Sequence, residues 1–358
     1  MTATHTDLEH RLRDTLLIHT EAARWDLAIE RSDRDGGGIV FHGHPGLTSA
    51  EHVLARTAYR RPILLDAGAY AGEKRKFASE PFDDNWTGRQ RRLGLPAVLP
   101  DAGYVAEDDE LGLVSVLARV QDAGGNTVAP LALHRSWLKP DHGLPALLGH
   151  VADAGVPIAV ALEHAYDPLS VRYVLEGLVD LLGVGVPVIV LRCDVSAIGA
   201  LCFGALAAAV GTKTSLRHLY PMTAGGGGGG ATASPAALVR ELLSYLRLSR
   251  IDQGVAADSD NSLWQCGCEV CGGQDLSWIN STSRPEQLAY LHSVEVLYDI
   301  RRDLFEAATT AEERRRTWIA QCDAAVFRHL EIDTESFAPT PQKVLGNWIS
   351  LRNREASA

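Results

Sequence analysis

The chain has 358 residues, which is enough for one large barrel with an appendage or for two ordinary domains. Hydrophobic residues make up 46% and charged residues 22%, so the composition supports a large core and excludes wholesale disorder. The net charge of −11 argues against a long nucleic-acid footprint, because such affinity comes largely from neutralised phosphates. A local basic patch remains compatible with this charge.

The first segment, residues 1–35, begins with polar and charged residues and predicts a helical or extended lead-in. It has no apolar run typical of a signal peptide, and the later apolar stretches are short or interrupted by Gly and Pro. Three of the six cysteines cluster and the others are scattered, which is typical of a metal site rather than of a disulfide framework. We therefore expect a cytoplasmic protein without a membrane span.

Residues 36–250 repeat one pattern, in which a short Val-, Ile- and Leu-rich run is followed by a stretch with helical spacing. The runs occupy 37–45, 61–70, 95–105, 126–138, 156–168, 186–198 and 212–221. Continuous apolar strands alternating with helices predict parallel strands covered on their outer faces. We therefore expect an α/β fold, a (β/α)8 TIM-type barrel, with an eighth strand near 237–248, a segment that also fits a helix. An open doubly wound sheet is the alternative, but no GxGxxG follows the first run.

The remaining segments predict an appended module. Six consecutive glycines, residues 225–230, fit a mobile linker or a lid, and no GK[ST] follows that would make them a phosphate-binding loop. Residues 251–335 are expected to form a zinc-binding module with helices, and residues 336–358 a C-terminal tail.

The zinc prediction rests on the segment WQCGCEVCGG. Cys266, Cys268 and Cys271 place three soft thiolates on one tight loop, a spacing that suits tetrahedral Zn²⁺. His292, on a predicted helix 21 residues after the third thiol, is expected to complete the site. The rival fourth ligands are His329 and a water molecule, which would make the metal catalytic. Three thiolates favour a closed structural site.

This module resembles that of the tRNA-guanine transglycosylases. The resemblance comprises the C-x-C-x2-C cluster after a barrel, the following histidine His292 and a later Ile300-Arg301 pair, and it extends over residues 36–305. The segment LLDAGAY, with Asp66, is similar to the family's aspartate–small–glycine segment before an aromatic residue. The resemblance implies exchange of a purine or 7-deazapurine base in tRNA or DNA, and pairing of subunits through the face of the zinc module.

Polar residues follow nearly every predicted strand, where the active site of a (β/α)8 barrel lies. The candidates for binding a substrate are Asp101, His134, Glu163, His164, Arg192, Arg217 and His218. His42 lies at the end of the first run. Arginine suits phosphate or carboxylate because its planar fork donates two parallel hydrogen bonds. Structural ion pairs and satisfied packing histidines are the alternatives for these residues.

Two carboxylates are the catalytic candidates. Base exchange passes through an oxocarbenium-like centre, which needs one carboxylate at C1′ and a group that moves protons on the bases. The resemblance gives Asp66 the proton-transfer role, and the alternative is a helix cap or loop brace. The sequence departs from the family at the nucleophile, because TKTSLRHLYPMTAGGGGGG contains no carboxylate. Asp194 is the substitute candidate, and an ion pair with Arg192 or Arg217 is its alternative.

The basic runs give a further prediction. They include 74–76, 89–92 and 314–316, and they fit either a nucleic-acid contact or a solvated helical face. Two functions therefore remain. The chain is a transglycosylase-like enzyme, or it is a catalytically inactive, zinc-bound barrel that serves as a nucleic-acid-binding or accessory subunit.

Overall fold

The computed structural model describes residues 3–222, 234–332, 337 and 342–353. The chain divides into two compact units, Met1–Met222 and Thr223–Ala358, which we call unit 1 and unit 2. The six-glycine run, 225–230, lies outside the described residues.

Unit 1 contains a curled parallel sheet of eight strands, which confirms the predicted α/β, TIM-like fold. The strands are β1 Thr15–Glu21, β2 Gly37–His42, β3 Ile63–Asp66, β4 Tyr104–Val105, β5 Ala129–His134, β6 Ile158–Glu163, β7 Val188–Cys193 and β8 Ala207–Gly211. Their order is β3-β2-β1-β8-β7-β6-β5-β4, so strands that are consecutive in the chain pair with each other, except β3 and β4, and β1 pairs with β8. Between β3 and β4 no ladder forms among the described residues, although Phe77 makes an isolated bridge to Tyr104.

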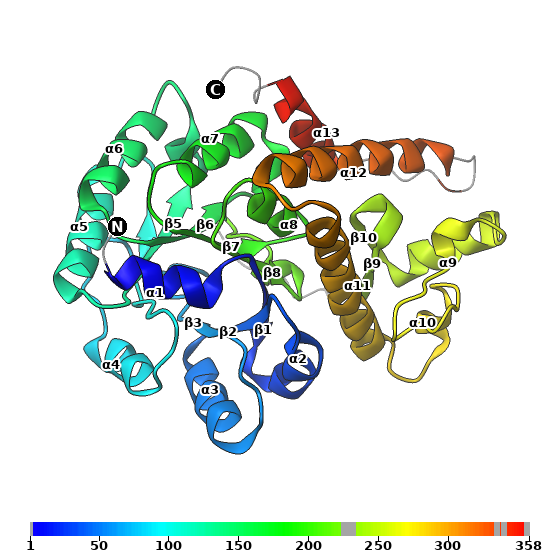
Figure 1. The fold of residues 1–358 in the computed structure, drawn as a ribbon, viewed down its shortest axis with the longest axis horizontal. Coiled ribbons are helices and arrows are strands. Elements are labelled where there is room, and N and C mark those ends of the chain that lie inside the picture. The colour runs from blue at the N-terminus through cyan, green and yellow to red at the C-terminus, as the bar shows by residue number, and fades with distance from the viewer. Residues whose placement is uncertain (1–2, 223–233, 333–336, 338–341, 354–358) are drawn as a thin grey trace. The chain divides into compact units, whose positions relative to one another are not determined.

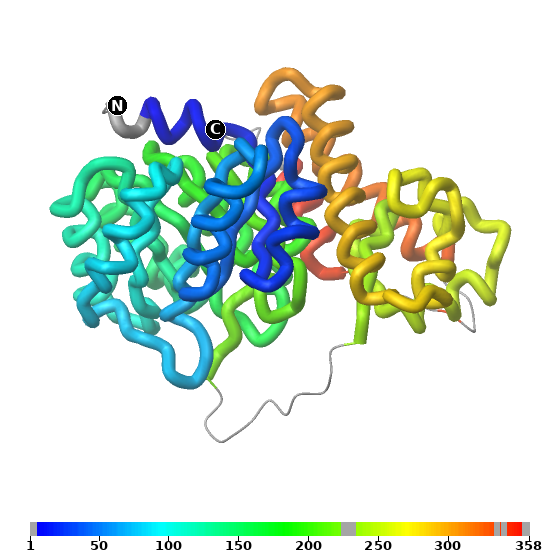
Figure 2. The backbone as a smooth tube through the Cα atoms, turned by 90° about the horizontal axis from the view of Figure 1, so that it is seen from below, coloured from blue at the N-terminus to red at the C-terminus, as the bar shows by residue number. Residues whose placement is uncertain are grey.

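Helices surround this sheet, as Figures 1 and 2 show. They are α1 Ala3–Leu12, α2 Trp25–Ser32, α3 His44–Arg56, α4 Asp84–Arg92, α5 Glu110–Ala123, α6 Leu144–Ala154, α7 Arg172–Leu182 and α8 Ser196–Cys202. Short 3-10 helices, Ala22–Arg24, Arg135–Leu138, Pro168–Ser170 and Thr214–Leu216, follow several of the strands. Helix α1 leads into the start of β1, and its Leu8 and Leu12 belong to the apolar cluster of the sheet interior. The N-terminal end of the barrel is therefore filled by apolar side chains, which leaves the opposite end for polar groups.

Two strands lie where the sequence pattern predicted something else. Strand β1 lies within residues 1–35, which were expected as a lead-in. Strand β8 is Ala207–Gly211, within a stretch expected as a helix, whereas 212–221 forms a loop with a 3-10 turn. The sequence of β8 is AAAVG, and alanine favours helices, but Ala207 and Ala209 face the crowded barrel interior between β1 and β7. Tertiary packing therefore overrides the local preference.

Unit 2 is helical, with one small hairpin. The hairpin pairs β9 Ala236–Val239 with β10 Ser244–Arg247, so the segment expected as an eighth barrel strand belongs to another sheet. The helices are α9 Leu248–Ala257, α10 Trp278–Ser281, α11 Pro285–Ala307, α12 Ala311–Glu331 and α13 Lys343–Ser350, with 3-10 turns at Arg240–Leu242, Ser262–Trp264 and Leu351–Asn353. Helix α12 begins with a capping box, in which Thr310 and Glu313 satisfy each other's backbone amides.

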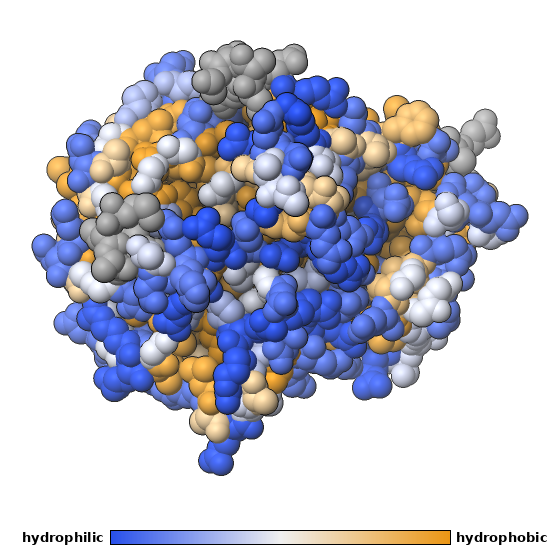
Figure 3. Space-filling model, viewed as in Figure 1, coloured by the Kyte–Doolittle hydropathy of each residue, from blue (hydrophilic) through white to orange (hydrophobic). Residues whose placement is uncertain are grey.

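The described helices are all too short or too polar to cross a membrane. On the face shown in Figure 3, hydrophilic residues alternate with separate apolar patches. The exposed apolar side chains include Leu111 and Val114 on α5 and Phe327 and Leu330 on α12.

Candidate active site and metal centre

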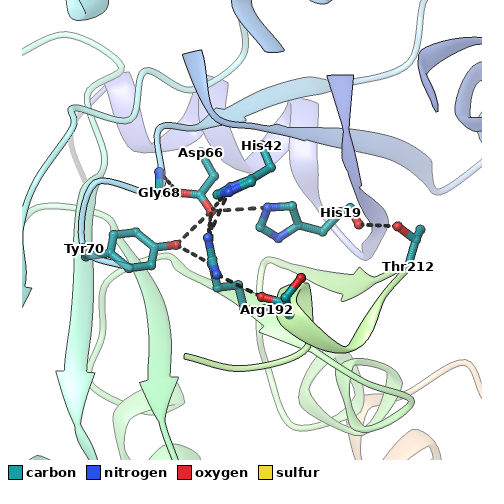
Figure 4. Close-up of polar contacts among 8 residues, drawn as sticks. His19, His42, Asp66, Gly68, Tyr70, Arg192 and Thr212 are labelled. Carbon is teal, nitrogen blue, oxygen red and sulfur yellow. Dashed lines mark hydrogen bonds and ion pairs between the residues drawn. The ribbon is translucent and has the colours of Figure 1, made fainter. Parts of the chain in front are cut away.

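The C-terminal end of the barrel holds a buried carboxylate, Asp66, at the last position of β3 (Figure 4). Its Oδ1 accepts a hydrogen bond from the Gly68 amide at 2.9 Å, and its Oδ2 accepts one from the Tyr70 hydroxyl at 2.8 Å. Arg192 lies 3.2 Å from the same Oδ2. Burial alone would raise the pKa of Asp66, but Arg192, His19 and His42 hold this pKa well below its usual range. Asp66 is therefore an ionised carboxylate at neutral pH.

Arg192 is the positive partner and adopts a strained backbone conformation. Its φ of 50° lies in the left-handed region, at an irregularity of the β7–β8 pairing between Val190 and Cys193. The guanidinium is buried and also donates to the Tyr70 hydroxyl at 3.0 Å and to the Ser215 carbonyl at 3.2 Å. Strained residues cluster at functional sites, and here the strain directs a cation from β7 toward a carboxylate on β3.

Two histidines from neighbouring strands complete this group. His19 on β1 places Nε2 3.2 Å from Asp66 Oδ2, and His42 on β2 places Nδ1 3.5 Å from it. Burial lowers the pKa of His19 to about 4, so its ring is neutral. The side chain of His42 is 30% exposed, whereas those of His19 and Asp66 are 0% and 3% exposed. His42 is thus the histidine that solvent or a ligand reaches. We call Asp66, His19, His42, Tyr70 and Arg192 the Asp66 centre.

Gly68 shapes the Asp66 centre through its backbone. Its φ is +65°, and a Cβ at this position would lie 2.1 Å from His42 Cε1 and 3.2 Å from Arg192 Nη2. The position therefore requires glycine both for its backbone and for the space that the His42 ring occupies. This is the physical reason for the glycine in the LLDAGAY segment.

The donor atoms of His19, His42 and Asp66 lie within 4.8 Å of one another, a grouping that could hold a metal ion. Arg192 Nη2, however, lies 3.2 Å from both Asp66 Oδ2 and His42 Nδ1, so a guanidinium already supplies the positive charge. In addition, His19 Nδ1 has no hydrogen-bond partner among the described residues, whereas a metal-bound imidazole commonly donates its other N–H. The donor set fits an internal ion pair better than a metal site.

A second buried ion pair lies at the same end of the barrel. Glu163, at the end of β6, accepts from Arg75 at 2.7 Å and from the Tyr104 hydroxyl at 2.5 Å. Arg75 also lies over the Tyr104 ring, 4.5 Å from its centroid. Lys76 pairs with the buried Asp101 at 2.5 Å. Two cations of the 74–76 run are therefore neutralised by carboxylates of the barrel, which removes them as free phosphate contacts.

The other predicted residues make local contacts; His134 and His164 lie at strand ends, whereas Asp101 precedes β4 and Arg217 follows the 3-10 turn after β8. Asp101 also accepts from the Asp83 amide at 2.6 Å, and His134 bonds Ser136 Oγ at 2.7 Å. Arg217 donates to the Gly211 carbonyl at 3.1 Å, and His164 accepts from the Tyr166 amide at 3.1 Å. The roles predicted for these residues in binding a substrate stay predictions.

Asp194 does not join the Asp66 centre among the described contacts. Its Oδ1 accepts from the Ser196 amide at 2.9 Å, a local Asx turn just before α8. Burial raises the pKa of the neighbouring Asp167 well above its usual range, and the negative charge of Asp194 adds to this effect. The alternative of an ion pair between Asp194 and Arg192 is wrong, because Arg192 is engaged by Asp66.

Unit 2 contains the second cluster of ligand-type side chains. The donor atoms of Cys266, Cys268, Cys271 and His292 all lie within 4.8 Å of one another, so the four predicted residues form a site that could hold a metal such as zinc. His292 Nδ1 lies 3.7, 3.5 and 3.2 Å from the three sulfur atoms in that order. Tetrahedral zinc, with ligand distances of about 2.0–2.3 Å, would place nitrogen and sulfur ligands roughly 3.5 Å apart. The donor set and its spacing therefore fit the ion.

The surrounding backbone prepares this cluster. His292 Nε2 lies 2.8 Å from the carbonyl of Leu238 in β9, so the ring donates there and Nδ1 presents its lone pair to the thiols. The Gly273 amide donates to the Cys266 carbonyl at 2.9 Å, and both Gly272 and Gly273 have positive φ. The rival ligand His329 instead lies near Ser244 and the Leu242 carbonyl. A cavity of about 440 Å³ borders the cluster, with Arg240 and Arg302 in its wall.

Sequence reasoning missed several residues of the Asp66 centre and its surroundings. His19 lies in β1, which was taken as part of the lead-in, and the only signal was the short run Leu16-Leu17-Ile18 before it. The pairing of Glu163 with Arg75 and with Tyr104 joins residues 88 and 59 positions apart, which no local pattern could indicate. His42 and Tyr70 were visible as polar or aromatic residues after strands, but their convergence on Asp66 was not.

Comparisons with known proteins assign no family. No protein-family model matches the chain, and no curated protein matches it.

Proposed function

We propose that the chain is a transglycosylase-like enzyme that exchanges a purine or 7-deazapurine base in nucleic acid, with the Asp66 centre as its active site. The observation that carries the proposal is the position of Asp66. The aspartate of the LLDAGAY segment lies at the C-terminal end of a parallel barrel strand, in contact with a partly exposed histidine and a strained arginine.

The geometry supports different roles for Asp66 and His42 in this proposal. Base exchange breaks the bond between C1′ and the departing base, and that base needs a proton as it leaves with the bonding electrons. Asp66 is ionised and accepts several hydrogen bonds, so it has no proton to give at neutral pH. His42 is partly exposed and held against Asp66, so it protonates the departing base, and it takes a proton from the incoming base as that base forms the new bond to C1′. Asp66 positions this imidazole and balances its charge.

We further propose that the Cys3His cluster binds Zn²⁺ and that this zinc is structural. Four protein ligands fill a tetrahedral site and leave no position for a reacting water. The zinc would hold the loop 266–273 against α11 and β9, without a step in the reaction.

One observation favours the second function, an accessory or binding subunit without catalysis. The family's nucleophile is absent from 212–230 in the sequence, and Asp194 lies beside Asp167 rather than in the Asp66 centre. A barrel that retains a rigid polar centre but no nucleophile would still bind a base.

A base-exchange assay separates the two functions. The purified chain would be incubated with labelled guanine or 7-deazaguanine and with tRNA or duplex DNA, beside Asp66→Asn, His42→Gln and Asp194→Asn. General acid–base groups contribute about 10²–10⁴-fold, so we expect His42→Gln to lose at least that factor. His52→Gln, which replaces an exposed histidine on α3, is the matched control and should retain activity. Absence of label in both polymers, with folded protein and bound zinc, would favour the accessory function.

A further inference from the structure

The loop that follows β8 carries an exposed aromatic ring on a rigid backbone. Tyr220 is 39% exposed, yet its carbonyl accepts from the buried Arg75 at 2.6 Å. The preceding residue, Leu219, is tied to the end of β6, because its amide donates to Leu162 at 3.0 Å and its carbonyl accepts from the His164 amide at 2.8 Å. The ring is therefore presented to solvent at a fixed position, at the C-terminal end of the barrel.

His218 lies beside this ring and has an unused hydrogen-bonding atom. The two ring centroids are 4.2 Å apart, and His218 is only 6% exposed. His218 bonds the backbone of Ala165, while its Nε2 is buried without a partner in the described part of the chain. Burial lowers the pKa of His218 to about 4, so the ring is neutral. Since the backbone carbonyl takes the N–H, the buried Nε2 is an acceptor that lacks a donor.

Such an acceptor is costly to leave empty, because buried polar groups are almost always hydrogen-bonded. A ligand that lies on Tyr220 and offers an N–H at its edge would satisfy it. The place also fits the proposed chemistry, since His218 interacts electrostatically with Arg192 of the Asp66 centre. Further aromatic side chains lie on the neighbouring loops, with Phe77 40% and Tyr166 76% exposed.

We propose that Tyr220 and His218 form the base-recognition site, in which Tyr220 stacks on a planar nitrogen heterocycle and His218 Nε2 accepts a hydrogen bond from an N–H on its edge. The ligand class is a neutral purine or 7-deazapurine with an amino or ring N–H donor. This inference rests on the proposed function, because it names the group that selects the base for the Asp66 centre.

The test compares two nucleosides by calorimetric titration of the full chain. Guanosine carries N–H donors on its base, whereas purine riboside has none. The wild-type chain should bind guanosine more tightly. Tyr220→Ala should weaken both nucleosides by about tenfold, since base–aromatic stacking contributes a factor of that order. His218→Phe retains a ring, so it should weaken guanosine by about tenfold and leave purine riboside within about twofold.

The controls replace the same residue types elsewhere. His142→Phe alters an exposed histidine that pairs with Asp108, and Phe327→Ala removes an exposed ring from α12. Neither should change binding, and thermal melting should show that all variants are folded. Unchanged guanosine binding in Tyr220→Ala and His218→Phe would overturn the inference, as would a wild-type chain that binds neither nucleoside.

The base-exchange assay and the nucleoside-binding test can fail independently of each other. Selective guanosine binding that depends on His218 and Tyr220, without base exchange, would leave the recognition site standing and remove the enzymatic proposal. Base exchange that both variants retain in full would leave the enzyme standing and remove the recognition site.

Discussion

The Asp66 centre of unit 1 and the Cys3His cluster of unit 2 both gather side chains that ligate metals, but they differ in charge. The first contains its own cation, since Arg192 lies within 3.2 Å of the carboxylate. The second offers three thiols and an imidazole with no cationic side chain within the donor group. The difference shows that donor proximity alone does not define a metal site. Whether a metal ion is needed depends on whether a cationic side chain already neutralises the negative charge of the donor atoms.

The largest effect should come from breaking the Cys3His cluster. Cys268→Ala removes one of four ligands, so we expect zinc to fall from about one per chain to nearly none and unit 2 to lose much of its stability, because metal binding and folding are coupled in such sites. Elemental analysis and thermal melting measure the two effects. Cys322→Ala, which removes a buried thiol of α12 outside the cluster, is the control and should retain the metal. Zinc that persists in Cys268→Ala would refute this metal site.

Removal of the cation should be the next largest effect. Arg192→Leu leaves Asp66 buried without its positive partner, which we expect to lower the free energy of unfolding by about 3–5 kcal/mol. Arg89→Leu removes one partner of a more exposed pair with Glu51, and should cost less than about 1 kcal/mol. Urea denaturation compares the two variants. Adding Asp66→Asn to Arg192→Leu should restore part of the loss, and similar costs for both arginines would contradict an internal counter-ion.

A smaller effect should follow from one methyl group. Gly68→Ala places a Cβ 2.1 Å from the His42 ring at a φ of +65°, whereas Gly72→Ala has a φ of +80° and open space around it. The backbone penalty is similar at both positions, so the difference between them isolates the displacement of His42. We expect Gly68→Ala to be less stable than Gly72→Ala by about 1–3 kcal/mol, as measured by chemical denaturation. Equal stabilities of Gly68→Ala and Gly72→Ala would mean that the His42 ring moves aside without a measurable cost in stability.

The effect that is smallest at neutral pH appears only as the solution is acidified. Burial lowers the pKa of His19 from 6.5 to about 4 in the folded chain. Between pH 6.5 and 4, His19 is therefore protonated in the unfolded chain but neutral in the folded chain. The stability should therefore fall as the pH drops from about 6.5 toward 4, and His19→Gln should show a shallower fall, by up to about 3 kcal/mol over this window. Asp66 contributes little here, because its folded pKa is lowered and its stabilisation is lost only below its unfolded pKa. If the free energy of unfolding falls equally for His19→Gln and wild type between pH 7 and 4.5, the conclusion that folded His19 is neutral would be wrong.

The local sequence was sufficient to predict the residues of the Cys3His cluster and the positions of most strands. The ligands of unit 2 come from one short loop and one helix, so their spacing already restricts them to a common site. The apolar runs indicated seven segments, and six of them contain barrel strands at the expected places. The first and last barrel strands in the chain, β1 and β8, were missed because LLI is too short, and AAAVG too alanine-rich, to be distinguished from a helix.

The sequence by itself determined the alternation of strands and helices and the Cys3His donor set, because both depend on residues close together in the chain. Only the tertiary structure decided that His19, His42, Asp66 and Arg192 meet, since they come from four strands whose ends are brought together by the curl of the sheet. It also decided the charge of that centre. Burial and the Arg192 cation on β7 set the pKa values of Asp66 and His19. Neither the burial nor the position of Arg192 can be inferred from the sequence around Asp66 or His19.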